Sequence, residues 1–170
     1  KIAKQNNIEG FANSLEDVLL RTFLCAKKYS LSHVVRISGD SPLIDPNLIL
    51  RLFENIDNEI DIITNIFPRS FPKGFSCEII KIETLKKILD FTNDLKYREH
   101  VTNYIYDNPF SFRIVNVTSD VEIFNNKNYS VDDEKDLIFI NKLYKRFGEK
   151  LFRMNVYEIV NLWEKRKLLF

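Results

Sequence analysis

Residues 33–64, HVVRISGDSPLIDPNLILRLFENIDNEIDIIT, decide the fold class. The stretch begins with a short β-branched segment at residues 33–38, which predicts a strand buried in a parallel sheet. Pro46 suits the first turn of a helix that continues to Phe53, and residues 60–64 predict the next strand. A strand, a loop, a helix and a further strand form a right-handed crossover whose loop lies at the carboxyl edge of the sheet. The stretch therefore predicts an α/β fold.

The flanking sequence continues this pattern. Apolar residues recur at helical spacing over residues 15–29, after a capping pair formed by Ser14 and Asp17. Further strands are expected at residues 75–82 and 112–117, and further helices at residues 83–91, 97–107, 134–147 and 156–163, the last capped by Asn155. No repeat or linker divides the sequence. We expect one domain over residues 1–147, followed by a helical extension over residues 148–170 that is more typical of packing or a dimer surface than of a site.

Composition excludes several classes of protein. The chain has 170 residues, of which 45% are hydrophobic, and its 25 Lys and Arg residues against 24 Asp and Glu residues leave a net charge of +1. A near-neutral chain lacks the electrostatic footprint of a nucleic-acid binder, so we expect no nucleic-acid partner. No stretch approaches the roughly 18 apolar residues of a membrane span. Cys25 and Cys77 have neither metal-ligand nor disulfide-framework spacing, which indicates buried thiols in a reducing cytoplasm.

The first segment with chemical potential is GDSPLIDP, residues 39–46. Gly39 permits a sharp turn after the strand, and Asp40 then projects from the carboxyl edge of the sheet. A carboxylate there is suited to Mg²⁺, which takes oxygen ligands from one or two carboxylates and from substrate phosphates. The alternative is that Asp40 and Asp45 are simply turn residues. Asp45 would then lie near a helix start, where negative charge is favoured. Spacing alone leaves both interpretations open.

The second segment is SVDDEKDL, residues 130–137, which opens the helix expected at residues 134–147. Asp132 or Asp133 can cap this helix and Asp136 lies in its first turn, so capping alone explains these acids. However, both acidic segments follow predicted strands. Two strand-end aspartates that converge across a cleft would form a divalent-metal site for phosphate chemistry.

Residues 64–79, TNIFPRSFPKGFSCEI, form the third segment. Rigid prolines beside Arg69 and Lys73 predict a fixed, cationic loop suited to a carboxylate or a phosphate. The alternative is an irregular surface excursion or a dimer contact.

The last segment is YREHVTNYIY, residues 97–106. Here Arg98, Glu99 and His100 open a predicted helix whose apolar residues face inward. His100 is also compatible with a hydrogen-bonded structural histidine.

Taken in order, these segments resemble the cytidylyltransferase family named after spore coat polysaccharide biosynthesis, whose relatives include the CMP-sialic acid and CMP-Kdo synthetases. Family members carry "GS.EDVL.R", "VVRITGDCPLIDP", "SN..PRTFPDGLDVEV", "REHVTPYI" and "VDEPEDL". This chain carries, over about residues 10–147, NSLEDVLLRTF from Asn13, VVRISGDSPLIDP from Val34, TNIFPRSFPKGFSCEI from Thr64, REHVTNYI from Arg98 and SVDDEKDL from Ser130. Five motifs in the same order and spacing support one another.

The resemblance implies a Rossmann-like nucleotidyltransferase fold of the nucleotide-diphospho-sugar transferase type, a mixed sheet flanked by helices. It implies a cytoplasmic homodimer in surface polysaccharide biosynthesis that uses Mg²⁺ to transfer CMP from CTP to a sugar or sugar acid, with release of pyrophosphate. By motif, Asp40 and Asp132 are the metal-binding catalytic residues, and Asp17 and Arg21 lie near the nucleotide. The acceptor side is assigned to Arg69, Glu78, Arg98 and His100.

Among the departures of the chain from the family pattern, two bear on its activity. Family members begin with a strand and a loop resembling "ARMGSTRLPGK", which cradles the triphosphate, and this segment is absent here. We therefore expect a chain truncated at its N-terminus and inactive or very weak by itself. Lys73 and Ser76 also stand where the family usually has acids, which removes negative charge from the acceptor side. The alternative function is a non-catalytic dimerisation or interaction module derived from the same family.

Overall fold

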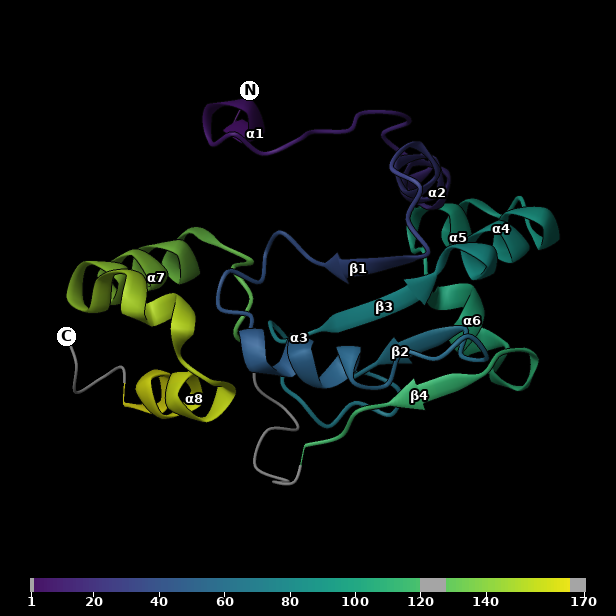
Figure 1. Cartoon of the computed structure of the whole chain (residues 1–170). Coiled ribbons are helices and arrows are strands. Elements are labelled where there is room, and N and C mark those ends of the chain that lie inside the picture. Colours follow the sequence, from purple (N-terminus) through teal and green to yellow (C-terminus); the bar gives the residue numbers. More distant parts are fainter. Residues whose placement is uncertain (1, 120–127, 166–170) are drawn as a thin grey trace. The chain divides into compact units, whose positions relative to one another are not determined.

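Strands are interspersed with helices along the chain in the computed structural model, which describes residues 2–119 and 128–165 (Figure 1). The strands are β1 His33–Ile37, β2 Ile62–Thr64, β3 Cys77–Lys81 and β4 Ile114–Asn116. The α-helices are α1 Ile2–Gln5, α2 Val18–Lys28, α3 Pro46–Phe53, α4 Ile82–Phe91, α5 Leu95–Glu99, α6 Asn103–Asp107, α7 Glu134–Phe147 and α8 Val156–Glu164. The 3₁₀ helices among the described residues are η1 Pro109–Ser111 and η3 Gly148–Arg153. The α/β class predicted from the sequence is confirmed.

The four strands form one mixed sheet in the order β1-β3-β2-β4. Strands β2 and β4 pair in parallel, with Ile62 opposite Ile114 and Thr64 opposite Asn116, whereas β3 runs opposite to β1 and β4 (Figure 1). The predicted connection from β1 through α3 to β2 is present. The two strands are not neighbours, however, because β3 lies between them.

Strand β1 differs from its prediction in its surroundings. It lies at the edge of the sheet, and Val35 and Ile37, which share a face by strand alternation, are 36% and 40% exposed. The expectation of a strand buried on both sides was wrong. A short β-branched run predicts the strand, but it carries no information on which strands lie beside it.

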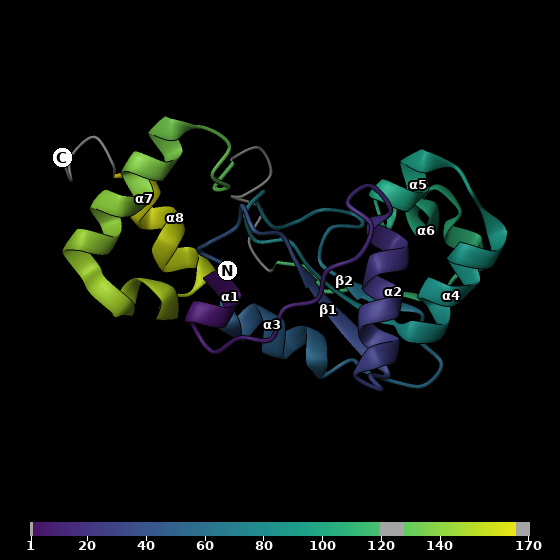
Figure 2. The same ribbon diagram turned by 90° about the horizontal axis from the view of Figure 1, so that it is seen from above.

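The chain divides into two compact units, one up to Val34 together with Ile80–Arg113, and the other Val35–Ile79 together with the residues from Ile114 onward. In the first unit α2 packs beside α4 and α5 (Figure 2). Its buried residues include Leu19, Ala26, Leu85, Ile88, Val101 and Ile105.

The second unit has an aromatic core. The ring of Tyr129 lies 4.9 Å from that of Trp163 and 5.6 Å from that of Phe75, and all three side chains are buried. Phe71 and Phe75 belong to this core, so the interpretation of residues 64–79 as a surface excursion was wrong. Residues 148–165 contribute side chains to the same core, most of them from α8. The domain boundary that we expect after residue 147 stays a prediction.

Two helix predictions needed correction. Helix α2 begins three residues later than expected, at Val18, because Asp17 is its N-cap and accepts from the Leu20 N–H. The single helix expected at residues 97–107 is two short helices. His100 ends α5, where its N–H donates to the Lys96 carbonyl, so it does not open a helix.

The helices α3, α7 and α8 begin where they were predicted. In α7, Asp133 and Asp136 form a reciprocal capping box, and Gly148 ends the helix with a φ of 57°. Asn155 caps α8 as expected. Within the described ranges, no helix is long and apolar enough to cross a membrane.

The two thiols have different surroundings and form no disulfide. Cys77 is fully buried in β3, and burial, with a smaller contribution from the charge of Glu78, raises the pKa of its thiol to about 11. Cys25 is only partly buried. The predicted burial is therefore complete for Cys77 alone, and Cys77 is a packing residue without nucleophilic character.

Asp45 caps α3 and also accepts the first N–H of α8, which gives it a structural role. Its Oδ1 accepts from the Asn47 N–H at the start of α3 (2.8 Å), and its Oδ2 accepts from the Val156 N–H at the start of α8 (2.9 Å). The residue is only 4% exposed. The substitution Asp45→Ala removes the cap of α3 and the contact to the first N–H of α8, and it leaves two N–H groups without this acceptor, so we expect the free energy of unfolding to fall by about 2–3 kcal/mol.

Urea denaturation measures this change, and Asp45→Asn is the matched control. Asparagine caps a helix about as well as aspartate but offers one acceptor oxygen, so it should lose about half as much. Equal stability of the alanine variant and the wild type would show that the two hydrogen bonds of Asp45 contribute nothing.

Candidate functional site

An open pocket of about 360 Å³ lies in the second unit. Its walls come from the end of β1 and the loop after it, from residues 66–78, and from the segment before α7. Its charged lining residues are Arg36, Asp40, Arg69, Lys73, Glu78 and Asp132. Four of the eight residues predicted for the site, Asp40, Arg69, Glu78 and Asp132, are therefore brought together.

Asp40 and Asp132 line the same pocket because their loops are joined through the backbone. The Val131 N–H donates to the Asp40 carbonyl (2.8 Å), which places the residue before Asp132 against Asp40. Both side chains are exposed. The Ser41 hydroxyl donates to Asp40 Oδ1 (2.9 Å), which leaves the second carboxylate oxygen open to a ligand.

The acids before α7 divide into two roles. Asp133 accepts from the Asp136 N–H as the helix cap, and Asp136 accepts from the N–H groups of Asp132 and Asp133. The Asp132 side chain does not cap the helix. It accepts from the Ser130 hydroxyl (3.0 Å) and from the Asn128 amide, and it lines the pocket.

The loop of residues 66–76 is held in shape by a buried asparagine that the sequence analysis did not single out. The Asn65 side chain donates to the Phe75 carbonyl (2.7 Å) and accepts from the Cys77 N–H (3.0 Å). One amide thus joins the start of the loop to its end. The signal in the sequence was a polar residue directly after an apolar strand, at a point where a loop must return to the sheet.

Gly74 lets this loop lie against the segment before α7. Its φ is 93°, and a Cβ at this position would lie 2.6 Å from the Tyr129 carbonyl carbon and 2.8 Å from the Ser130 nitrogen. The neighbouring Lys73 carbonyl accepts from the Tyr129 N–H (2.9 Å). Gly39 lies in the predicted turn after β1, where the Ser41 N–H donates to the Ser38 carbonyl (3.2 Å), but its φ is ordinary and a Cβ there would have open space, so this turn does not require glycine.

The charges on the pocket wall are partly paired. Glu78 has a side chain that is only 2% exposed, and its Oε2 accepts from Arg36 at 2.7 Å. Arg69 donates to the Ser76 hydroxyl at 3.1 Å. Arg36 was missed by the sequence analysis, although its position in a strand that ends at the predicted site could have identified it.

The other four predicted residues, Asp17, Arg21, Arg98 and His100, belong to the first unit. Arg21 donates to the carbonyls of Ser14 (2.6 Å) and Leu15 (3.1 Å), where it supports the start of α2. His100 is exposed. The binding roles assigned to these residues by resemblance stay predictions.

Arg98 has a structural role of its own. Its guanidinium donates to the Asp17 carboxylate (3.2 Å), to the Thr92 and Leu89 carbonyls and to the Asn93 side chain. Asp17 meanwhile caps α2. One arginine thus ties the start of α2 to the end of α4 and the turn that follows it.

The donor set of the pocket fits one kind of metal. In the residues that the structure describes, no group of three or more His, Cys, Asp or Glu side chains is placed to hold a metal ion. A closed structural zinc site is thus not formed there. Two exposed carboxylates, Asp40 and Asp132, match Mg²⁺, which is commonly held by one or two carboxylates together with substrate phosphates.

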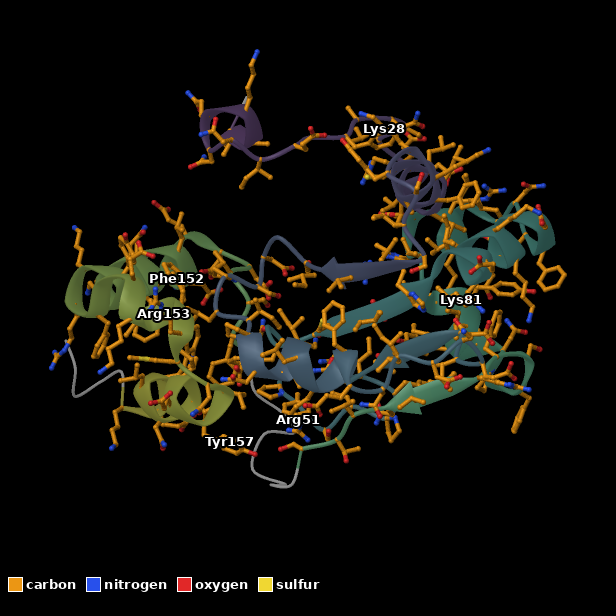
Figure 3. All side chains as sticks on the ribbon, viewed as in Figure 1. Lys28, Arg51, Lys81, Phe152, Arg153 and Tyr157 are labelled. Atoms are coloured by element: carbon orange, nitrogen blue, oxygen red, sulfur yellow. The ribbon has the colours of Figure 1, made fainter. Side chains whose placement is uncertain are left out.

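Two smaller cavities lack this chemistry. One, of about 220 Å³ in the first unit, is lined by Phe11, Cys25 and Leu31. Another, of about 260 Å³, lies between α3 and α8, where Figure 3 labels Arg51 and Tyr157. Asp45 on its wall is committed to helix capping. The pocket with Asp40 and Asp132 is therefore the candidate site.

Comparisons with known proteins identify the family of the chain. Residues 7–166 match the sequence profile of a family described as cytidylyltransferase. An uncharacterized protein of Methanocaldococcus jannaschii is 29% identical over 91% of the chain, and the spore coat polysaccharide biosynthesis protein SpsF of Bacillus subtilis is 28% identical over 82%. The chain covers 63% and 58% of these two relatives, so it spans less than two thirds of their length.

A solved structure shares the fold. A cytidylyltransferase from Leptospira borgpetersenii serovar Hardjo-bovis superimposes with a TM-score of 0.89 at 24% sequence identity. The superposition covers 99% of the present chain and 71% of the Leptospira chain. The predicted nucleotidyltransferase fold is confirmed.

Proposed function

The chain belongs to the cytidylyltransferase family, and on that premise we propose that it serves the transfer of CMP from CTP to a sugar or sugar acid, with release of pyrophosphate. The family match confirms the resemblance carried by the five sequence motifs. The observation that carries the proposal is the placement of Asp40 and Asp132, from separate segments, on one pocket that also holds cationic side chains. Similarity to a spore coat polysaccharide biosynthesis protein supports a role in making surface polysaccharide.

In the proposed reaction Asp40 and Asp132 hold Mg²⁺. The ion supplies neutralisation of the charge that develops on the departing pyrophosphate. The two residues are suited to this because their carboxylates are exposed on the pocket, while Asp133 and Asp136 carry out the helix capping. The capping acids thereby leave Asp132 available for a ligand.

We propose that two other charged residues of the same pocket, Arg69 and Glu78, bind the acceptor. Arg69 lies in the loop of residues 66–76, and Glu78 is fixed by Arg36. By resemblance, Arg98 and His100 would also serve the acceptor, and Asp17 and Arg21 the nucleotide. We further propose that the protein acts in the cytoplasm as a homodimer.

The test is pyrophosphate release by the full gene product that contains residues 1–170, because the chain spans less than two thirds of its curated relatives. The assay contains Mg²⁺, each of the four nucleoside triphosphates in turn, and a panel of sugar acids and neutral sugars. We expect release that needs both CTP and an acceptor and that stops when EDTA removes the metal. Failure with every nucleotide and acceptor would contradict the proposal and favour a non-catalytic interaction module.

A further inference from the structure

Positive charge is concentrated in α7 and η3, in the second unit of the chain. Residues 134–153 contain six Lys or Arg residues and three Asp or Glu residues, a net charge of +3 in a chain whose total is only +1. None of these residues lines the candidate pocket. The near-neutral balance of the whole chain therefore conceals a local cationic segment that the proposed reaction does not use.

The outer face of α7 carries apolar side chains among these cations. The helix buries its other face in the core of the second unit. On the outer face Leu137 and Ile138 are each 49% exposed, and Tyr144 is 41% exposed. Leu137 and Tyr144 are two helical turns apart and share one stripe, while Ile138 and Lys145 share the neighbouring stripe. An apolar stripe thus runs beside a cationic one.

The apolar stripe continues onto η3. The ring of Phe152 lies 5.5 Å from that of Tyr144, and Phe152 is 38% exposed. The next residue, Arg153, is exposed as well, and Figure 3 labels both side chains. The exposed side chains of α7 and η3 together form a surface in which aromatic and aliphatic groups lie among cations. We call it the α7–η3 surface.

The cations of this surface are available to a partner. Four of them are exposed and form no hydrogen bond or ion pair with any residue in the ranges 2–119 and 128–165, namely Lys135, Lys145, Lys150 and Arg153. Two of the three acids of the segment already have partners. Asp136 closes the capping box of α7, and Glu149 accepts from the Tyr144 hydroxyl (2.8 Å). The positive charge is therefore not neutralised locally.

This combination of charge and apolar groups favours one kind of partner. A second copy of the chain would bring a positive surface against a positive surface, and the two would repel each other. A bilayer that contains anionic lipids has a negative surface, with apolar acyl chains directly below it. Both layers complement the α7–η3 surface, and aromatic rings such as that of Tyr144 are favoured at the boundary between them.

We propose that the α7–η3 surface binds to an anionic lipid bilayer. Leu137, Ile138 and Phe152 contact the boundary of the acyl chains, and the surrounding cations contact the headgroups. The protein then lies on the membrane through a partly exposed helix and does not insert a spanning segment. This inference goes beyond the proposed function and does not depend on it, because it involves no residue of the pocket.

Vesicle flotation tests the proposal with the full gene product that contains residues 1–170. We expect at least about hundredfold tighter binding to phosphatidylcholine vesicles with about 30% phosphatidylglycerol than to phosphatidylcholine alone, because each free cation near an anionic surface contributes about fivefold. About 0.5 M NaCl should lower the affinity at least tenfold, since salt screens this attraction.

Two double variants separate the charge from the apolar contact. Lys145→Gln with Lys150→Gln should lower the affinity for the anionic vesicles about 25-fold, the loss of two cations. Leu137→Gln with Ile138→Gln keeps every charge and should lower it about tenfold, because the apolar side chains no longer enter the boundary of the acyl chains. All four side chains are exposed, so circular dichroism should show folded variants with an unchanged melting temperature.

The matched controls lie in the first unit. Lys4→Gln with Lys27→Gln removes the same two charges from exposed positions, and Phe110→Gln removes an apolar side chain that is fully exposed in η1. Both controls should bind the anionic vesicles as the wild type does. Equal losses in the control pair and in the Lys145 and Lys150 pair would overturn the proposal, because the attraction would then belong to the chain as a whole.

Other outcomes also decide against a bilayer. Absence of binding to either kind of vesicle, or equal binding to both, overturns the proposal. So does an affinity for anionic vesicles that the Leu137 and Ile138 pair leaves unchanged. Soluble poly-glutamate is the last arm of the test. If it binds the α7–η3 surface as tightly as the vesicles do, the partner is an acidic polypeptide and the bilayer assignment is wrong.

Discussion

Replacement of Gly74 by alanine is expected to lower the free energy of unfolding by about 3 kcal/mol, the largest stability effect that we predict for a single methyl group in this chain. Two costs add. A φ of 93° disfavours any residue with a Cβ, and the new atom would lie within 2.8 Å of the backbone of Tyr129 and Ser130. Because those neighbours are backbone atoms, the two loops must separate.

The other glycines provide matched controls, measured by urea denaturation. Gly148 also has a positive φ, of 57°, but no atom lies within 4 Å of the position that a Cβ would take, so Gly148→Ala should show the backbone cost alone, about 1–2 kcal/mol. Gly39 has neither feature, so Gly39→Ala should leave stability within about 0.5 kcal/mol of the wild type. A loss at Gly74 no larger than that at Gly148 would show that the loop contact is not tight.

The helices that the sequence predicted correctly are those whose ends are set by neighbouring residues. Helix α3 begins at Pro46 after the cap Asp45, and α7 runs from the capping box of Asp133 to Gly148. These signals act over one turn of helix and are visible in a single sequence. The helix expected at residues 97–107 failed because its apolar spacing continues through His100 although the backbone turns there.

Contacts between distant segments were not predictable in the same way. Gly74 is required because of Tyr129 and Ser130, more than fifty residues later, and Gly39 looked the better candidate only because it follows a strand. The pairing of Arg36 with Glu78 joins β1 to β3, and no local pattern encodes it. Side-chain spacing carries information about one element at a time, while the partners of these residues depend on the order of strands in the sheet.

Part of the candidate site, its two exposed aspartates, could be predicted because these residues lie next to elements with clear local signals. Asp40 and Asp132 each follow or precede an element with clear local signals, and the resemblance placed both at one site. Asp17 and Arg98 were assigned to ligands from the same resemblance, yet here they pair with each other across the first unit. A charged residue in a motif can serve the protein's own structure, and only its partners in space reveal that role.

Removal of either pocket carboxylate is expected to reduce the rate of the proposed reaction most strongly. We expect Asp40→Asn and Asp132→Asn each to lower kcat/KM for Mg²⁺-dependent pyrophosphate release by about a hundredfold or more, since a neutral amide is a poor ligand for Mg²⁺. Both side chains are exposed, so stability should change by less than about 1 kcal/mol. The two changes should also raise the Mg²⁺ concentration needed for half-maximal rate.

The control for this prediction is Asp133→Asn, next to Asp132 in the chain. It removes the same charge, but asparagine caps a helix as well as aspartate, and Asp133 does not line the pocket. Its rate should stay within about threefold of the wild type. The double variant of Asp40 and Asp132 should lose little more activity than either single variant, because two ligands of one ion act as a unit. Additive losses, or an unchanged Mg²⁺ dependence in Asp40→Asn, would mean that these carboxylates do not share a metal.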